Sequence, residues 1–235
     1  MYLCHKFQFM QKIIIALDGH SSCGKSTTAK LVASKLGYAF VDTGAMYRAV
    51  SLYFSEYHVS LTNPKEIDEA LQNIYITFKF NEKTGRSDTY LNGLNVEEEI
   101  RKMYISNRVS EVAAISAVRK AMVAQQQKMG KHRGIVMDGR DIGSKVFPDA
   151  ELKIFMTADP QIRAIRRQQE LLAKDELVEL DEILENLQKR DIIDSTRADS
   201  PLIQVTDALL MDTSFMTIDE QVDYVLQKHA EIVNR

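Results

Sequence analysis

The segment "GHSSCGKST" (residues 19–27) combines glycines, a lysine and hydroxyl side chains at the spacing of a phosphate-binding loop. The pattern G-x-x-x-x-G-K-[ST] runs from Gly19 to Ser26. Glycines let backbone N–H groups turn toward phosphate oxygens, and a following helix adds the positive end of its dipole. Lys25 places a cation at the β- and γ-phosphates, and the Ser26 hydroxyl can ligate Mg²⁺. The segment therefore predicts binding of a nucleoside triphosphate with Mg²⁺.

The sequence on either side of this loop supports the same interpretation. The apolar run over 12–19 is typical of a strand buried on both faces, and residues 25–36 show a helical spacing that stops at Gly37. A chance Gly/Ser turn before a helix is the alternative, and the combination of strand, spacing and helix disfavours it. The residues predicted to bind the triphosphate are Gly19, His20, Ser21, Ser22, Cys23, Gly24, Lys25, Ser26 and Thr27.

An arginine follows the next predicted strand. In "FVDTGAMYRAV" (40–50), Thr43 is expected to cap a helix, and Arg48 lies about one turn into it. An arginine there can grip an anion at the same edge of the sheet as the loop. Taken alone, Arg48 is equally well explained as a solvated side chain.

Acidic and basic residues also follow the buried strand in "VMDGRDIG" (136–143), which ends with Asp138, Arg140 and Asp141. An acid directly after an apolar strand resembles the Mg²⁺-side carboxylate of this class of loop, which usually acts through water. We therefore expect Asp138 to assist Ser26 at the metal.

The predicted helix near 180–197 carries an apolar stripe that turns into charge. Leu180, Ile183, Leu184 and Leu187 face inward at helical spacing, and the stripe continues onto charged residues. Unpaired buried ions are costly, so these side chains must meet something charged. A phosphate and sugar site is favoured, and a structural ion-pair cluster is the alternative. The charged residues are Arg190, Asp191, Asp194 and Arg197.

A run of arginines precedes that helix. Arg163, Arg166 and Arg167 lie in a predicted helix followed by a polar segment, so that 161–180 is either solvated surface or a lid within the helical region 161–197. A lid would close arginines over the transferring phosphoryl group and exclude water.

The order of predicted elements indicates an α/β protein. Continuous apolar strands alternate with helices, which implies a parallel sheet covered on both faces. A long helix is expected over about 105–129, and segments 75–80 and 89–93 alternate like a hairpin inserted into this rhythm. With 235 residues and no linker, we expect a single domain over 1–235.

The composition of the chain limits the classes of partner and the cell compartment that can be expected for this protein. A formal charge of −3 argues against a nucleic-acid binder, and no apolar run approaches the roughly 20 residues that span a membrane. Cys4 and Cys23 cannot form a disulfide framework, and the opening residues are too polar and too short for a secretion signal, which favours the cytoplasm. Cys23 is either a small filler, the favoured interpretation, or an oxidisable thiol near a helix N-terminus.

Five segments of the chain together resemble the bacterial cytidylate kinase family of nucleoside monophosphate kinases. They are "IALDGHSSCGKST" (15–27), "DTGAMYRA" (42–49), "NRVSEVAAISAVRKAM" (107–122), "VMDGRDIGSKVFPDAELKIFMTA" (136–158) and "KRDIIDSTRADSPL" (189–202). The resemblance implies a phosphate-loop fold with a five-stranded parallel core (12–59, 96–160 and 198–235), a hairpin-containing monophosphate-binding insertion (about 60–95) and a short lid. It also implies a monomer that transfers the γ-phosphate of ATP to CMP or dCMP with Mg²⁺.

From the residues themselves, Lys25, Arg140, Arg163 and Arg167 are expected to carry catalysis by neutralising charge and holding the reacting oxygens in line. The resemblance also assigns roles to residues. Ser110, Arg119 and Asp141 would read the cytosine, with Arg197 beside them. Arg48 and Arg140 would hold the acceptor phosphate, Asp194 the sugar hydroxyls, and Arg190 the sugar or phosphates. The implied acceptor-binding residues are Thr43, Arg48, Ser110, Arg119, Asp138, Arg140, Asp141, Arg190, Asp194 and Arg197.

Two departures from the family pattern stand out. Thr43 occupies a position where the family commonly has Ser, so the hydroxyl is kept. The loop differs from the commoner "GPSGAGK" form at His20, Ser22 and Cys23.

Two other functions stay open at the level of sequence. One is a related small-molecule kinase that acts on UMP, another nucleotide or a non-nucleotide acceptor. The other is a non-catalytic nucleotide-binding regulator, which the second set of anion-binding residues disfavours because a binding module needs no second phosphate site.

Overall fold

The apolar run near the start of the chain forms the central strand of a parallel sheet. The computed structural model describes residues 11–81 and 86–234. Its main sheet has the order β2-β6-β1-β7-β8, and every pairing in it is parallel. The prediction of a five-stranded parallel sheet is confirmed. The strands are β1 (Ile14–Gly19), β2 (Ala39–Asp42), β6 (Ile135–Gly139), β7 (Leu152–Thr157) and β8 (Leu209–Asp212).

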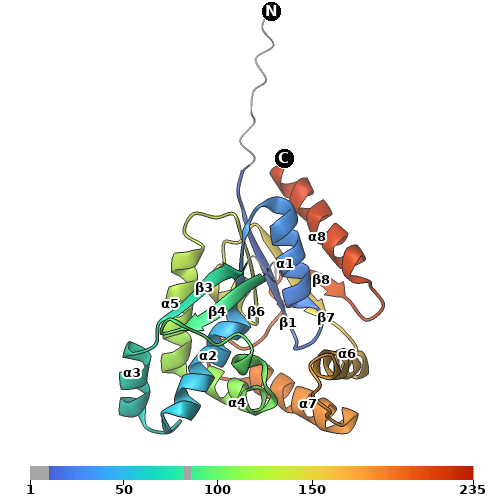
Figure 1. The fold of residues 1–235 in the computed structure, drawn as a ribbon. Coiled ribbons are helices and arrows are strands. Elements are labelled where there is room, and N and C mark those ends of the chain that lie inside the picture. Colours follow the sequence, from blue (N-terminus) through green and yellow to red (C-terminus); the bar gives the residue numbers. More distant parts are fainter. Residues whose placement is uncertain (1–10, 82–85, 235) are drawn as a thin grey trace, which may run out of the picture.

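Helices cover both faces of this sheet (Figure 1). The α-helices within the described residues are α1 (Lys25–Leu36), α2 (Thr43–Glu56), α3 (Pro64–Gln72), α4 (Met103–Ala113), α5 (Ser116–Met129), α6 (Pro160–Leu172), α7 (Leu180–Thr196) and α8 (Ile218–Val233). Successive side chains of β1 alternate between two cores, as a strand buried on both faces requires. Ile14 and Ala16 pack with α2, α4 and α5, whereas Ile15 and Leu17 pack with α1 and α8.

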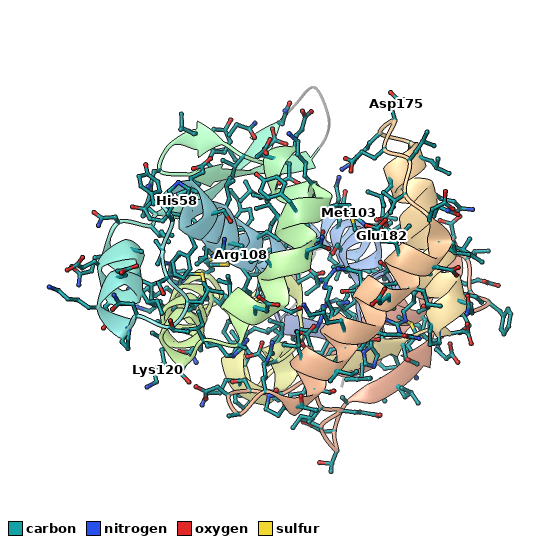
Figure 2. The ribbon with its side chains drawn as sticks, turned by 90° about the horizontal axis from the view of Figure 1, so that it is seen from below. His58, Met103, Arg108, Lys120, Asp175 and Glu182 are labelled. Carbon is teal, nitrogen blue, oxygen red and sulfur yellow. The ribbon has the colours of Figure 1, made fainter. Side chains whose placement is uncertain are left out.

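A third apolar cluster joins α6 to α7 at the end of the sheet where the strands finish. Ala164 and Leu171 of α6 pack against Ile183 and Leu187 of α7, and Met103 at the start of α4 packs against this cluster. Figure 2 looks onto this edge and shows Met103 beside Glu182 of α7, with Asp175 at the tip of the α6–α7 connection. The apolar half of the predicted stripe on α7 thus holds this helix against α6.

The predicted hairpin is part of a small antiparallel sheet. β3 (Ile76–Asn81) pairs with β4 (Arg86–Leu91), which also pairs with a short β5 (Leu94–Asn95) that the sequence pattern did not indicate. The connection over 82–85 lies outside the described residues.

The long helix expected over about 105–129 is instead two helices. Ile115, between α4 and α5, has an extended backbone (φ −72°, ψ 119°), which ends one helix before the other begins. The break places Ser110 and Arg119 on different helices.

The start of α2 also differs from the expectation. Asp42, and not Thr43, is the N-cap: its Oδ1 accepts a hydrogen bond from the Ala45 N–H at 2.9 Å. Asp and Thr are both good caps, so residue type did not decide between them. The Thr43 hydroxyl donates instead to the Asp138 carbonyl oxygen at 2.7 Å and ties α2 to β6.

Two further observations concern the composition. Within the part of the chain that the structure describes, no helix is both long and apolar enough to cross a membrane. Cys23 is a free, buried thiol, and Cys4 lies outside the described residues.

A substitution at Phe54 tests how much the packing of the larger core stabilises the protein. Its side chain is fully buried on α2, so Phe54→Ala should lower the free energy of unfolding by about 3–5 kcal/mol. Phe215 is 93% exposed, and Phe215→Ala should change it by less than about 0.5 kcal/mol. Urea unfolding of both variants measures the two values. Equal losses would contradict the packing described above.

Candidate active site

The phosphate loop adopts backbone conformations that its glycines permit. Gly19 has φ +146°, and a Cβ there would lie 1.9 Å from the Met156 carbonyl oxygen. Gly24, the N-cap of α1, has φ +96°. Ser22 also has positive φ (59°), a conformation uncommon outside glycine. These turns direct the loop into the start of α1, whose N-terminal N–H groups favour an anion.

Lys25 lies inside this loop. Its Nζ donates to the His20 carbonyl oxygen and lies 3.6 Å from the Cys23 sulfur. Burial, with a further contribution from the nearby Arg140 guanidinium, lowers the pKa of Lys25. The Cys23 thiol donates to the same His20 carbonyl at 3.0 Å, so it has a structural bond of its own.

Ser26 and Asp138 meet at the carboxyl ends of β1 and β6. The Ser26 hydroxyl donates to Oδ2 of Asp138 at 2.6 Å. Oδ1 of Asp138 is buried and has no hydrogen-bond partner among the described residues. Burial, and next the charge of Asp42, raise the pKa of Asp138 to about 7. A cation nearby would favour the charged form of this carboxylate.

Arg140 connects the phosphate loop to α7. Its Nη2 donates to the Ser21 hydroxyl at 2.7 Å, and its Nε pairs with Oδ2 of Asp194 at 2.8 Å. Arg140 therefore stands between the loop and the charged half of α7. The charged end of the stripe predicted on α7 therefore lies at Arg140, beside the phosphate loop.

Further arginines converge on the same place. Burial, followed by the charges of Arg140 and Arg167, lowers the pKa of Arg190 to about 10, and Nε of Arg190 has no partner among the described residues. Burial also lowers the pKa of Arg48 well below its ordinary value, aided by Arg190 and Arg101. Like charges gathered without enough carboxylates favour an anionic ligand between them.

A buried ion pair lies behind this cluster. Arg119 of α5 pairs with Asp141 directly after β6, and both side chains are 3% exposed. Arg119 also donates to the Ala113 carbonyl at 3.1 Å and lies over the ring of Tyr47, 5.3 Å from its centroid. Burial acts to lower the pKa of Arg119, but Asp141 outweighs it, so the pKa lies above its ordinary value.

Arg197 and Asp194 connect this pair to the arginine cluster. Their side chains are 3.4 Å apart, and burial and then the charge of Arg119 lower the pKa of Arg197. Burial acts to raise the pKa of Asp194, but Arg140, Arg190 and Arg197 outweigh it and keep the carboxylate ionised. Nη2 of Arg197 is buried without a partner among the described residues.

The remaining predicted acceptor residues lie on neighbouring elements. Ser110 is buried on α4, one turn before the Ala113 carbonyl that accepts from Arg119. Arg48 of α2 donates to the Ser106 hydroxyl at 2.9 Å and so contacts α4. The Thr43 hydroxyl is engaged by the Asp138 carbonyl, as described above.

Arg163 lies inside the structure, and the solvated interpretation of this residue is wrong. It is 3% exposed, and its guanidinium pairs with Asp191 at 2.6 Å and donates to the Ser21 carbonyl at 3.3 Å. His20 Nδ1 lies 3.3 Å from the same Asp191 carboxylate. Arg163 and Asp191 therefore hold the phosphate loop against α6 and α7.

The other arginines of α6 bond elsewhere. Arg166 donates to the Thr213 carbonyl at 2.6 Å, which ties α6 to the segment after β8. Arg167 donates to the Arg101 carbonyl at 3.2 Å and lies near enough to Arg48 and Arg190 to depress their pKa values.

Sequence reasoning missed Arg101, which ends a short 3₁₀ turn (Glu99–Arg101). Its guanidinium pairs with Asp42 at 2.7 Å and with Glu97 at 2.8 Å, and Glu97 accepts from Thr89 of the small sheet at 2.6 Å. This chain of bonds joins the small sheet to the arginine cluster. Its only sequence signal was an arginine after an acidic run, which is also typical of solvated surface.

The two anion-binding groups adjoin each other. Arg140 touches the phosphate loop through Ser21 and also lowers the pKa of Lys25 by its charge. A molecule held by the loop and a second anion held by Arg48, Arg140 and Arg190 would lie side by side, the arrangement that phosphoryl transfer needs. The fold and the site thus define a phosphate-loop kinase.

Comparison with known proteins narrows this class. A sequence profile of the cytidylate kinase family matches residues 15–231. A cytidylate kinase of Cytophaga hutchinsonii is 59% identical over 217 residues, which cover 92% of this chain and 93% of that protein. One of Parabacteroides distasonis is 53% identical over 227 residues, with coverages of 95% and 99%. The chain belongs to the cytidylate kinase family, as the resemblance of its motifs indicated.

Solved structures support the fold. An uncharacterized protein from Eubacterium ventriosum matches with a TM-score of 0.52 over 94% of this chain and 99% of that one. The two sequences are 11% identical, so this similarity concerns architecture alone.

Asp191 should stabilise the protein in a pH-dependent manner. Burial opposes its charge, but bonds from His20 and Arg163 outweigh burial and lower its pKa to about 2. A depressed folded-state pKa contributes stability above the unfolded value near 3.8, and this contribution is lost as pH falls toward 2. Asp191→Asn should therefore lower the free energy of unfolding by about 2 kcal/mol at pH 7 and by less at pH 3.

Urea unfolding at pH 7, 5 and 3 measures this difference. Asp223, which is 73% exposed, provides the control: Asp223→Asn should change stability by less than about 0.5 kcal/mol at each pH. A loss in Asp191→Asn that is the same at pH 7 and pH 3 would contradict the role of the charge.

Proposed function

We propose that this protein transfers the γ-phosphate of ATP to CMP or dCMP and releases ADP with CDP or dCDP. The observation that carries the proposal is the gathering of Arg48, Arg140 and Arg190 beside the phosphate loop. Membership of the cytidylate kinase family supports the choice of acceptor.

In this proposal the loop holds the triphosphate and the arginines hold the acceptor phosphate. Lys25 neutralises charge at the β- and γ-phosphates, and Arg140 lies between donor and acceptor, where charge develops during transfer. The acceptor phosphate is already ionised at pH 7, so a general base contributes little. Catalysis then rests on positioning and on charge neutralisation.

Arg167 and Arg163 would have different roles in the proposed phosphoryl transfer. Arg167 adds positive charge from α6 to the cluster, and closure of the 161–180 segment over the phosphates would exclude water. Arg163 is bonded to Asp191 and to the phosphate loop, which favours a role in holding the loop's shape.

The buried Arg119–Asp141 pair favours cytosine as the base. Cytosine presents an amino donor beside two acceptors, which a carboxylate can meet together with Arg119, Ser110 and Arg197. Uracil would instead place a carbonyl oxygen against the Asp141 carboxylate, so that both groups would be buried without a hydrogen-bond donor. The cost of these unpaired groups would discriminate strongly against uracil and in favour of cytosine. Asp194, held ionised by its arginines, would bond the sugar hydroxyls, and Arg190 would lie near the sugar or phosphates.

The residues at the loop suit Mg²⁺. The unpartnered Oδ1 of Asp138 and the Ser26 hydroxyl offer hard oxygen donors, one through water and one directly. The described residues contain no cluster of three or more His, Cys, Asp or Glu that could hold a metal alone, so the nucleotide phosphates would complete the coordination. When bound, Mg²⁺ would neutralise charge on the β- and γ-phosphates.

The remaining expectations stay part of the proposal. They are a monomer in the cytoplasm, with a core over 12–59, 96–160 and 198–235, a monophosphate-binding insertion near 60–95 and a lid near 161–180.

An acceptor panel tests the proposed function. ADP release from ATP and Mg²⁺ is measured with CMP, dCMP, UMP, AMP and GMP, and CMP or dCMP should give the highest kcat/KM. Strong turnover of UMP with none of CMP would reject the assignment. Tight ATP binding without transfer to any monophosphate would indicate a regulator instead.

Substitutions on the two sides of the site should separate donor from acceptor. Asp141→Ala and Arg197→Ala should raise the KM for CMP at least about tenfold while the KM for ATP changes about twofold or less, because both residues face the acceptor. Lys25→Ala should instead lower kcat by about 10³-fold, since it removes charge needed in the transition state. Steady-state kinetics with each substrate varied in turn distinguishes these outcomes, and equal damage to both KM values in Asp141→Ala would undo the assignment.

A further inference from the structure

Asp18 is a buried carboxylate to which neither the motif nor the proposed mechanism gives a role. It is the penultimate residue of β1, directly before Gly19, and it is 7% exposed. Its Oδ1 accepts from the Ile142 N–H and its Oδ2 from the Gly143 N–H, both at 2.7 Å. Among the described residues it has no ion-pair partner, so its bonds go to the backbone of one short segment.

That segment begins at Asp141, the residue paired with Arg119. The backbone on one side of Asp141 is held by the sheet, where Gly139 is in register with Asp18. The backbone on the other side, at Ile142 and Gly143, is held by the Asp18 side chain. The same residue thus fixes both flanks of Asp141.

The turn itself needs this external support. Residues Ile142–Val146 form a single π-helical turn in which the Asp141 carbonyl accepts from both Lys145 and Val146. The first N–H groups of a helical turn have no partner within it, and a buried one left unpaired is costly. Asp18 supplies the two missing acceptors, and these N–H groups have no other hydrogen-bond acceptor among the described residues.

Only an ionised carboxylate satisfies both donors. Its two oxygens accept from adjacent N–H groups, whereas an amide offers one oxygen and sets its own NH₂ against the second donor. Burial raises the pKa of Asp18 to about 6 despite these bonds, so the charge is retained at neutral pH at a cost to stability.

We propose that Asp18 is a positioning residue for the acceptor base: its carboxylate holds the backbone after Asp141, so that the Asp141 carboxylate stays aligned with Arg119 before the acceptor binds. The inference rests on the proposed function, in which Asp141 reads cytosine. The donor side is expected to be spared. The side chain of Asp18 bonds to the 142–143 segment, and although the charge of Lys25 acts to lower the pKa of Asp18, no hydrogen bond or ion pair joins that side chain to the phosphate loop among the described residues.

Asp18→Asn tests this role by steady-state kinetics at pH 8, where the wild-type carboxylate is ionised. The KM for CMP should rise at least about tenfold while the KM for ATP stays within about twofold of wild type. A KM for CMP within about twofold of wild type, or a proportional rise in both KM values, would overturn the proposal. A general loss of stability moves both substrates together, so the split between them reports positioning.

Glu151→Gln is the matched control. Glu151, directly before β7, is also a carboxylate that supports a backbone N–H: its Oε2 accepts from Ile14, at the opposite end of β1 from Asp18, at 3.0 Å, and it pairs with Arg133. This variant should leave both KM values within about twofold of wild type. If wild type itself fails to phosphorylate CMP, the proposed function is rejected, whereas a CMP-active wild type with an unaffected Asp18→Asn rejects the role of Asp18 alone.

Hydrogen exchange on the wild-type protein supplies a test that needs no substituted chain to fold. If Asp18 holds the turn in advance, the amides of Ile142 and Gly143 should exchange within about tenfold of the β6 amides before CMP is added. Faster exchange that slows to the β6 rate only with CMP would show that the ligand orders the turn, and this result would overturn the proposal.

Discussion

Positive charge is concentrated where the parallel strands end, and the surrounding structure is organised around that charge. Burial lowers the pKa of both Arg48 and Arg190, and the charge of a neighbouring arginine lowers each further: Arg190 acts on Arg48, and Arg140 acts on Arg190. Gathering like charges away from water is unfavourable unless carboxylates or an anion compensate. Asp194, which pairs with Arg140, compensates part of the charge, and the excess that remains favours an anionic ligand.

The parallel sheet brings the two halves of the site together. β1 and β6 are neighbours, so the phosphate loop after one strand adjoins Asp138, Arg140 and Asp141 after the other. The side chain of Asp18 adds a second connection, from β1 to the turn that follows β6. In the proposed function, the loop that would hold the donor and the segment that would hold the acceptor base follow neighbouring strands, so the sheet, and not a flexible connection, would set the distance between donor and acceptor.

The helices add support from outside the sheet. Asp191 joins α7 to Arg163 of α6 and to His20 of the phosphate loop, while Asp42 and Glu97 hold Arg101 beside Arg48. Charged residues therefore have two roles in this molecule. Some are expected to contact the ligand, and others hold those side chains in position. The residue types alone do not separate the two groups, because arginines and aspartates occur in both.

Much of the fold and of the candidate site could be predicted from local pattern. Apolar runs identified all five strands of the main sheet, and the spacing of Gly19, Gly24 and Lys25 identified the phosphate loop, because strand burial and loop conformation depend on short stretches of chain. The burial of Arg163 and the roles of Arg101 and Asp18 depended on partners far away in the chain. Such partners leave no periodic signal. The sequence by itself therefore determined the order of the elements and the family, whereas only the tertiary structure decided which charged side chains bond to one another and which keep charge to offer a ligand, since pairing depends on distances that folding alone creates.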